Sequence, residues 1–283
     1  MDLLRASAQT EDEPTAASTR IDVNGLSAEV RGLIAGDAAA EMTLRARELD
    51  LHSIPAHAGS GTRIAAFFDI DGTLIRGSIA GHMFAQGVAE GRARRSSYLV
   101  FFLFFLLYKL NLIPRARMYR WGFNLGAGIT VAEAIDFVRR CLRERIGRQV
   151  YLGAREMVGL HRSLGHRVVA VTGAPDYAAA QIASALGFDD VLATATPIVG
   201  ERLGSEVREP ICYGDGKIQY VRAYAAKHDL DLGRCYFYSD SRSDLPLLRL
   251  VGHPVCVNPQ MLLWIPALIR RWDILLLRRL GEL

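Results

Sequence analysis

The feature that most constrains the fold is an apolar run, residues 64–68, that ends directly at two aspartates, Asp69 and Asp71. The run shows no alternation of polar and apolar residues, which is typical of a strand buried on both faces of a parallel sheet. Open α/β sheets bind ligands at the carboxyl ends of their strands, so this strand would deliver both carboxylates to a binding site. Residues two apart on an extended chain point to the same side, and Gly72 allows an immediate turn. Paired carboxylates suit metal binding and acid–base chemistry, because the charge of one helps the other to hold a proton.

The charge of the chain is unevenly distributed. Residues 1–62 hold ten acidic and five basic side chains, whereas the whole chain of 283 residues carries +4, so the remainder carries +9. Excess positive charge suits an anionic substrate, an anionic membrane surface or nucleic acid. The sequence contains no nucleic-acid motif and no basic stripe interleaved with aromatic residues, so we expect no nucleic-acid partner. The length fits one α/β domain with an insertion, or two small domains.

The N-terminal residues and the cysteines indicate the cellular setting. Residues 1–62 are predicted to form an extension that is partly disordered, because residues 6–18 are rich in Ala, Thr, Glu and Ser. They lack the basic-then-apolar layout of a secretory signal. The four cysteines form no C-x-x-C pair, which favours buried, reduced thiols. These features predict a cytoplasmic protein.

Two further predicted strands also end at polar residues. The run 168–171 is followed by Thr172 and Gly173, whose hydroxyl and backbone N–H can donate hydrogen bonds to an anionic oxygen. The run 235–238 is followed by Ser239 and then by a pair of acids, Asp240 and Asp244. Additional strands are predicted at residues 191–195 and 254–257.

A lysine near these acids would neutralise part of their charge, and the interval between Thr172 and Asp240 offers candidates. The only two lysines in that interval are Lys217 and Lys227. Lys217 follows a Gly-Asp-Gly turn that opens a predicted helix, whereas Lys227 lies late in that helix beside His228 and is expected on the surface. We therefore favour Lys217.

These features, in this order, resemble the motifs of the haloacid-dehalogenase superfamily of phosphatases, and the resemblance covers residues 63–283. It implies a Rossmann-like parallel sheet flanked by helices, with an inserted helical cap domain. It also implies that Asp69 attacks phosphorus and that Asp71 acts as the acid and then the base. Thr172, Gly173 and Lys217 are implied to bind the phosphate. Mg²⁺ is implied to be bound by the Asp69 side chain, the Asp71 carbonyl and Asp240. Asp244 is implied to orient the Mg²⁺ ligands or the lysine.

About 100 residues separate Asp69 from the next predicted strand, whereas a βαβ crossover needs only a few tens. We therefore expect an insertion over residues 76–165, with the catalytic core at 63–75 and 166–283. The insertion is predicted to be helical: Thr130 and Glu133 form a capping box that opens an amphipathic helix ending near Gly147.

Two apolar segments with basic flanks stand out, at residues 98–113 and 261–269. The ten residues 98–107 would rise about 15 Å as a helix, half of what a bilayer requires, so a spanning helix is the weakest interpretation. Contact with an anionic membrane surface, burial within the cap and a dimer contact all remain open. The last segment fits either a water–lipid boundary or a helix packed on the sheet.

The sequence thus predicts an Mg²⁺-dependent phosphomonoesterase that acts through an aspartyl-phosphate. The resemblance is strongest to the subgroup containing the phosphoserine phosphatases, but the Glu that this group carries nine residues after the nucleophile is replaced by Ser78. A lipid phosphate or a small phosphorylated metabolite is therefore the expected substrate, and phosphoserine is the alternative. A second alternative is a non-catalytic regulatory protein on the same fold. The oligomeric state is not predicted.

Overall fold

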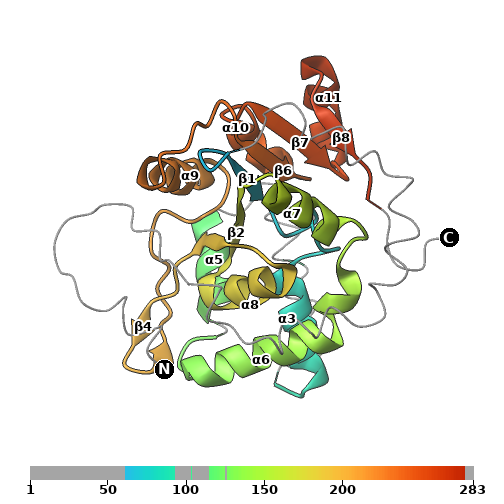
Figure 1. Cartoon of the computed structure of the whole chain (residues 1–283). Coiled ribbons are helices and arrows are strands. Elements are labelled where there is room, and N and C mark those ends of the chain that lie inside the picture. Colours follow the sequence, from blue (N-terminus) through green and yellow to red (C-terminus); the bar gives the residue numbers. More distant parts are fainter. Residues whose placement is uncertain (1–60, 93–102, 104–114, 125, 278–283) are drawn as a thin grey trace.

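The computed structural model describes residues 61–92, 103, 115–124 and 126–277. Their centre is a six-stranded parallel sheet with the strand order β3-β2-β1-β6-β7-β8, of which Figure 1 labels every strand except β3. The predicted α/β class with a parallel sheet is confirmed. The strands are β1 Ala65–Phe68, β2 Arg167–Pro175, β3 Asp190–Thr194, β6 Tyr236–Ser239, β7 His253–Val257 and β8 Asp273–Leu275.

Alternate residues of β1 contribute to two separate hydrophobic cores. Ala66 and Phe68 belong to the core on one face of the sheet, whereas Ala65 and Phe67 belong to the core on the other. All four residues are fully buried, which explains why the run is continuously apolar. Among the described residues both faces of β1 are therefore covered, which leaves its carboxyl end as the place where a ligand would be expected.

Helices cover the two faces in sequence order. The first core includes side chains of α6 Val131–Glu144, α7 Ala154–Ser163 and α8 Asp176–Leu186. The second core includes side chains of α9 Asp215–Lys227, α10 Leu245–Leu248 and α11 Met261–Arg270. A short antiparallel hairpin, β4 Ile198–Val199 with β5 Arg202–Leu203, lies outside the main sheet. This hairpin and β8 are two elements that the sequence analysis missed.

Between β1 and β2 the described chain is mainly helical, as predicted. Its other elements are α3 Ile79–Ala89, α5 Arg115–Asn124 and the short 3₁₀ helix Ile146–Gln149. The capping box is present: Thr130 Oγ1 accepts a hydrogen bond from Glu133 N, and Glu133 accepts one from Thr130 N. The predicted end of this helix near Gly147 was wrong, because α6 ends at Glu144 and the chain continues as the 3₁₀ helix. The proposed division into core and cap stays a prediction.

Several expectations concern residues outside the described part. The predicted N-terminal extension lies outside it except for residues 61 and 62, and the apolar segment 98–113 lies outside it except for Leu103. Within the described residues, no helix is both long and apolar enough to cross a membrane. The four cysteines, all described, are buried and unpaired with one another.

A polar cluster lies within the otherwise apolar core on the α7 side of the sheet. His161 Nε2 lies 2.7 Å from the hydroxyl of Tyr238, and its Nδ1 lies 2.9 Å from Nδ1 of His166. Burial lowers the pKa of His161 to about 3, and the neighbouring His166 acts in the same direction. His161 is therefore neutral in the folded protein at neutral pH.

This burial predicts a pH-dependent stability. In the unfolded chain a histidine has its ordinary pKa of about 6.5, so between about pH 6.5 and 3 the unfolded state binds the additional proton. Neutral His161 therefore makes its full contribution to the free energy of unfolding above about pH 6.5. That contribution is lost as the pH falls, by up to about 1.4 kcal/mol per pH unit. Urea unfolding of His161→Gln should show a shallower loss of stability between these limits than the wild type. Equal slopes would contradict the assignment of a neutral buried histidine.

Candidate active site

The predicted site residues come mainly from the carboxyl ends of neighbouring strands. Asp69 follows β1 and Asp240 follows β6, which pairs with β1 in parallel. Parallel strands end at the same edge, so these two carboxylates are delivered to one place. Thr172 and Gly173 lie in the last part of β2, on the other side of β1.

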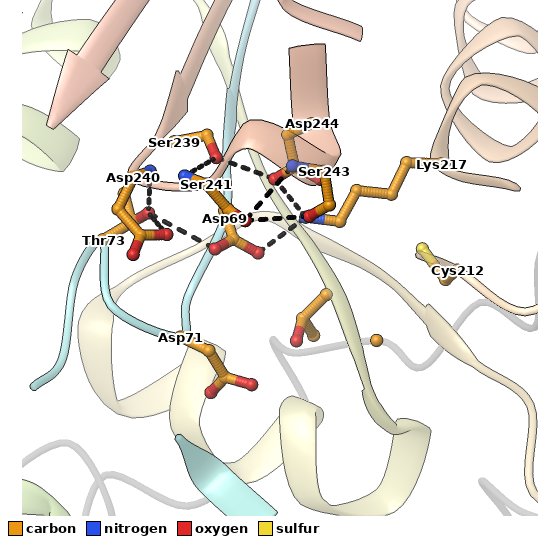
Figure 2. A network of polar contacts seen from close by, with 12 residues as sticks. Asp69, Asp71, Thr73, Cys212, Lys217, Ser239, Asp240, Ser241, Ser243 and Asp244 are labelled. Carbon is orange, nitrogen blue, oxygen red and sulfur yellow. Dashed lines mark hydrogen bonds and ion pairs between the residues drawn. The ribbon is translucent and has the colours of Figure 1, made fainter. Parts of the chain in front are cut away.

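The strongest interaction in the site is a double ion pair of Lys217. Its Nζ lies 2.7 Å from Oδ1 of Asp69 and 2.7 Å from Oδ2 of Asp244 (Figure 2). All three side chains are buried, with at most 8% of each exposed. Burial opposes the charge of Lys217, but the carboxylates of Asp244 and Asp69 outweigh it and raise the pKa of the ammonium group. Lys217 is therefore a fixed positive charge against Asp69, whereas Lys227 is exposed at the end of α9.

A second set of hydrogen bonds connects Asp69 with Asp240 through Thr73. Thr73 Oγ1 lies 3.3 Å from Oδ2 of Asp69 and 3.5 Å from Oδ1 of Asp240, and it accepts a hydrogen bond of 2.9 Å from Asp240 N. Gln260 donates from its side chain to Oδ2 of Asp240 at 2.8 Å. The position of Asp240 is thus defined from both sides.

Gly72 is required by this arrangement for two reasons. Its φ of +82° lies in the left-handed region that side chains other than glycine rarely adopt. A Cβ at this position would also overlap the Oδ2 atom of Asp240. The turn after β1 and the position of Asp240 therefore depend on each other.

Asp71 is oriented differently from the other acids. Figure 2 shows its carboxylate directed away from the network of Asp69, Lys217 and Asp244. Its Oδ1 accepts a hydrogen bond of 2.8 Å from Ile79 N, at the first turn of α3. Burial raises the pKa of Asp71 to about 6, although the hydrogen bond from Ile79 opposes that shift. A carboxyl group of this kind can hold a proton near neutral pH.

The Thr172–Gly173 segment is contacted by α5, one of the helices between β1 and β2. Thr172 is buried, and its Oγ1 accepts a hydrogen bond of 3.2 Å from Ala174 N. The hydroxyl of Tyr119, from α5, lies so close to Gly173 that a Cβ there would collide with it. The predicted phosphate-binding segment therefore forms part of the wall between the sheet and α5.

The charge balance of the site fits a divalent cation. The site holds four acidic side chains (Asp69, Asp71, Asp240 and Asp244) and one lysine, and burial together with the three neighbouring acids raises the pKa of Asp69 against the effect of Lys217. No group of three His, Cys, Asp or Glu residues suited to a metal ion occurs in the described part of the chain. The predicted set differs from such a group, since it combines two carboxylates with the Asp71 carbonyl. Mg²⁺ binds proteins through one or two carboxylates and keeps several waters, so this donor set suits it.

Sequence reasoning did not identify three residues of this network. Thr73 lies four residues after Asp69, and the sequence analysis assigned no role to it. Ser239 donates to Oδ2 of Asp244 at 2.7 Å, and its position at the end of a buried strand was the available signal. Gln260 lies 20 residues beyond Asp240, and no local pattern connects the two.

Comparison with known proteins identifies similar chains. The family model for haloacid dehalogenase-like hydrolases matches residues 66–249. A probable phosphatase of Mycobacterium tuberculosis is 35% identical over 226 residues, which cover 78% of each chain. A phosphoserine phosphatase of the same organism is 35% identical over 215 residues, covering 74% of this chain and 70% of the relative. A solved structure of a Bordetella pertussis protein of unknown function matches with a TM-score of 0.70 and 26% identity, covering 76% of this chain and 98% of that one. These matches favour an enzyme over the non-catalytic alternative.

The dual role of Gly72 can be tested with a matched glycine. Gly128 has the same φ of +82°, but a Cβ there would meet no atom within 4 Å. Gly72→Ala and Gly128→Ala should both lose about 1–2 kcal/mol of stability from backbone strain. Only Gly72→Ala should also lose hydrolysis of p-nitrophenyl phosphate, because Asp240 must move. Equal activity of the two variants would show that the position of Asp240 is not critical.

Proposed function

Because the chain belongs to the haloacid dehalogenase-like hydrolases and is a phosphatase of that family, we propose that it hydrolyses a phosphomonoester through an aspartyl-phosphate on Asp69. The observation that carries this proposal is the buried double ion pair of Lys217 with Asp69 and Asp244. It holds a carboxylate at the end of a central strand, beside a cation that can neutralise phosphoryl oxygens. Phosphoryl transfer needs positioning and charge neutralisation above all.

In the first step, a carboxylate oxygen of Asp69 forms a bond to phosphorus as the ester P–O bond breaks. Asp71 gives its proton to the leaving oxygen, so that the product departs as an alcohol. In the second step, Asp71 accepts a proton from water, whose oxygen attacks phosphorus and releases Asp69 and inorganic phosphate. The Asp71 carboxyl must turn from Ile79 N toward the ester for both transfers.

The remaining residues bind and orient the phosphoryl group. Thr172 and the backbone N–H of Gly173 are proposed to donate hydrogen bonds to its oxygens, and Lys217 to neutralise their charge. Asp244 orients Lys217, because it holds the same ammonium group as Asp69 and is held in turn by Ser239. A buried lysine with two carboxylate partners has little freedom to leave this position.

Mg²⁺ is the proposed cofactor, bound by the Asp69 side chain, the Asp71 carbonyl and Asp240. When bound, it would offset the negative charge that the acids and the phosphoryl group bring together. Thr73 and Gln260 hold the Asp240 carboxylate in place for this role.

The helical insertion at residues 76–165 is proposed to act as a cap domain that covers the substrate. The contact of Tyr119 with Gly173 supports this, because it brings α5 against the phosphate-binding segment. Exclusion of water would strengthen the electrostatic interactions within the site.

The substrate class is proposed from residue 78, where the phosphoserine phosphatases carry a glutamate and this chain has a serine. Ser78 caps α3, and its Oγ accepts a hydrogen bond of 3.1 Å from Gly81 N. A hydroxyl used in this way offers no negative charge to the ammonium group of phosphoserine, so phosphoserine is the alternative and not the preferred substrate. A lipid phosphate or a small phosphorylated metabolite without an amino group fits this position better, and peripheral contact with an anionic membrane surface would bring a lipid phosphate within reach.

Replacement of the nucleophile tests the mechanism. Asp69→Asn should lower p-nitrophenyl phosphate hydrolysis by more than about a thousand-fold, because the amide cannot form the phosphoenzyme. Asp136→Asn removes an exposed acid on α6 and is the control for loss of one negative charge. Acid-quenched enzyme should retain labelled phosphate in the wild type and in Asp136→Asn, but not in Asp69→Asn. Unchanged activity of Asp69→Asn would exclude the aspartyl-phosphate mechanism.

A substrate panel tests the specificity. Phosphate release with Mg²⁺ should be faster from lysophosphatidate, phosphatidylglycerophosphate or sugar phosphates than from phosphoserine. Ser78→Glu, which introduces the missing acid, should shift the ratio of kcat/KM values toward phosphoserine. Wild-type activity that is greatest with phosphoserine would reverse the preference stated here.

A further inference from the structure

The outward face of α11 is unusually apolar. Eight large apolar side chains are exposed in the described residues; five of them come from α11, and a sixth, Leu276, directly follows β8. On the helix, exposure ranges from 55% for Leu262 to 79% for Met261. The outer face of α11 is formed by Met261, Leu262, Ile265, Leu268 and Ile269.

The spacing of these residues shows that two opposite faces of one helix are apolar. Met261, Ile265 and Leu268 follow one another at helical intervals of four and three, whereas Leu263 and Ala267 point inward and are fully buried in the second core. A surface helix normally presents charged or polar residues on its outer side. A contiguous apolar surface on a folded protein marks an interaction site.

A basic cavity lies at the C-terminal end of the same helix. It has a volume of about 280 Å³, and its polar lining includes Arg249, Arg270 and Arg271 together with His253, Trp272 and the acid Asp273. The guanidinium group of Arg270 lies 5.6 Å from the ring centre of Trp272. Arginine side chains suit phosphate groups, and tryptophan is enriched where protein meets the lipid head groups.

We propose that α11 and this cavity form a docking surface for an anionic phospholipid membrane. The outer face of α11 would enter the boundary between head groups and acyl chains, with the helix axis parallel to the membrane plane. The three arginines would contact lipid phosphates beside it. The net charge of +9 outside residues 1–62 acts in the same direction.

The size of the surface favours a membrane over a second copy of the chain. The docking surface comprises the five residues of the outer face of α11 and the three arginines of the cavity, whereas each side of a standard protein interface contributes about 20–30 residues. A stable protein interface buries about 800 Å² on each partner. A lipid surface sets no such minimum, because each side chain that enters it contributes separately.

The docking surface is directly connected to the active site. Gln260, the residue that precedes α11, donates from its side chain to Asp240 and from its backbone N to the Asp240 carbonyl at 2.8 Å. Docking would therefore hold one end of the active site against the membrane, where a lipid phosphate is found. The inference does not depend on the proposed substrate, because membrane binding can be measured without turnover.

Vesicle co-sedimentation of the full chain tests the proposal. The wild type should bind phosphatidylcholine vesicles that contain phosphatidylglycerol at low salt, and bind pure phosphatidylcholine vesicles much more weakly. The double variant Ile265→Gln/Ile269→Gln should lose more than about tenfold in affinity. Arg270→Gln/Arg271→Gln should lose about thirtyfold on anionic vesicles and become less sensitive to added salt than the wild type.

Val199→Gln is the matched control, because Val199 is 73% exposed but lies on the β4–β5 hairpin. It should bind vesicles like the wild type. All variants should hydrolyse p-nitrophenyl phosphate at the wild-type rate, which separates loss of docking from loss of folding or of the phosphatase mechanism.

Several outcomes would overturn the proposal. If the wild type does not bind anionic vesicles, the proposal is wrong. If the wild type binds but the α11 variants bind equally well, another segment of the chain is responsible for the binding. A wild-type dimer that Ile265→Gln/Ile269→Gln converts to a monomer would assign the surface to a second copy.

Discussion

The arrangement of the site depends on one buried cation held between two carboxylates. Lys217 comes from α9, Asp69 from the end of β1 and Asp244 from the turn after β6, so three separate elements meet at a single ammonium group. A buried charge is strongly unfavourable unless it is paired and hydrogen-bonded. The ion pairs therefore require α9 and the two strands to hold their relative positions, and Ser239 further restricts Asp244. This constraint preorganises the proposed nucleophile.

The parallel sheet brings the acids together but does not neutralise them. Adjacent strands β1 and β6 end at the same edge, so Asp69 and Asp240 are close although 171 positions separate them in the chain numbering. One lysine cannot balance four nearby carboxylates, which is the physical reason for a divalent cation in the proposed function. The close approach of Asp240 to the turn after β1 is possible only because residue 72 has no side chain. The conformation of this turn therefore determines where the Asp240 carboxylate can lie.

Much of this could be predicted from local patterns. The apolar run before Asp69 predicted a strand buried on both faces, and β1 is fully buried. The capping box at Thr130 predicted the start of α6, because both of its hydrogen bonds lie within four residues. The choice of Lys217 over Lys227 agrees with their burial, since only Lys217 lies inside the protein. The end of α6 and the three-residue strand β8 were missed, because short elements and helix ends depend on packing that no local pattern encodes.

The sequence by itself determined five of the six strands of the main sheet and their order along the chain, the identity of the acids at their ends and the helical character of the segment between β1 and β2. Only the tertiary structure decided that Gln260 contacts Asp240, that Asp71 turns toward α3, and that α11 has an apolar face on each side. Residues 261–269 are apolar throughout, so their sequence is compatible with burial and with a lipid boundary alike. Which side of a helix meets the core depends on contacts between residues distant in sequence, and those contacts exist only once the chain has folded.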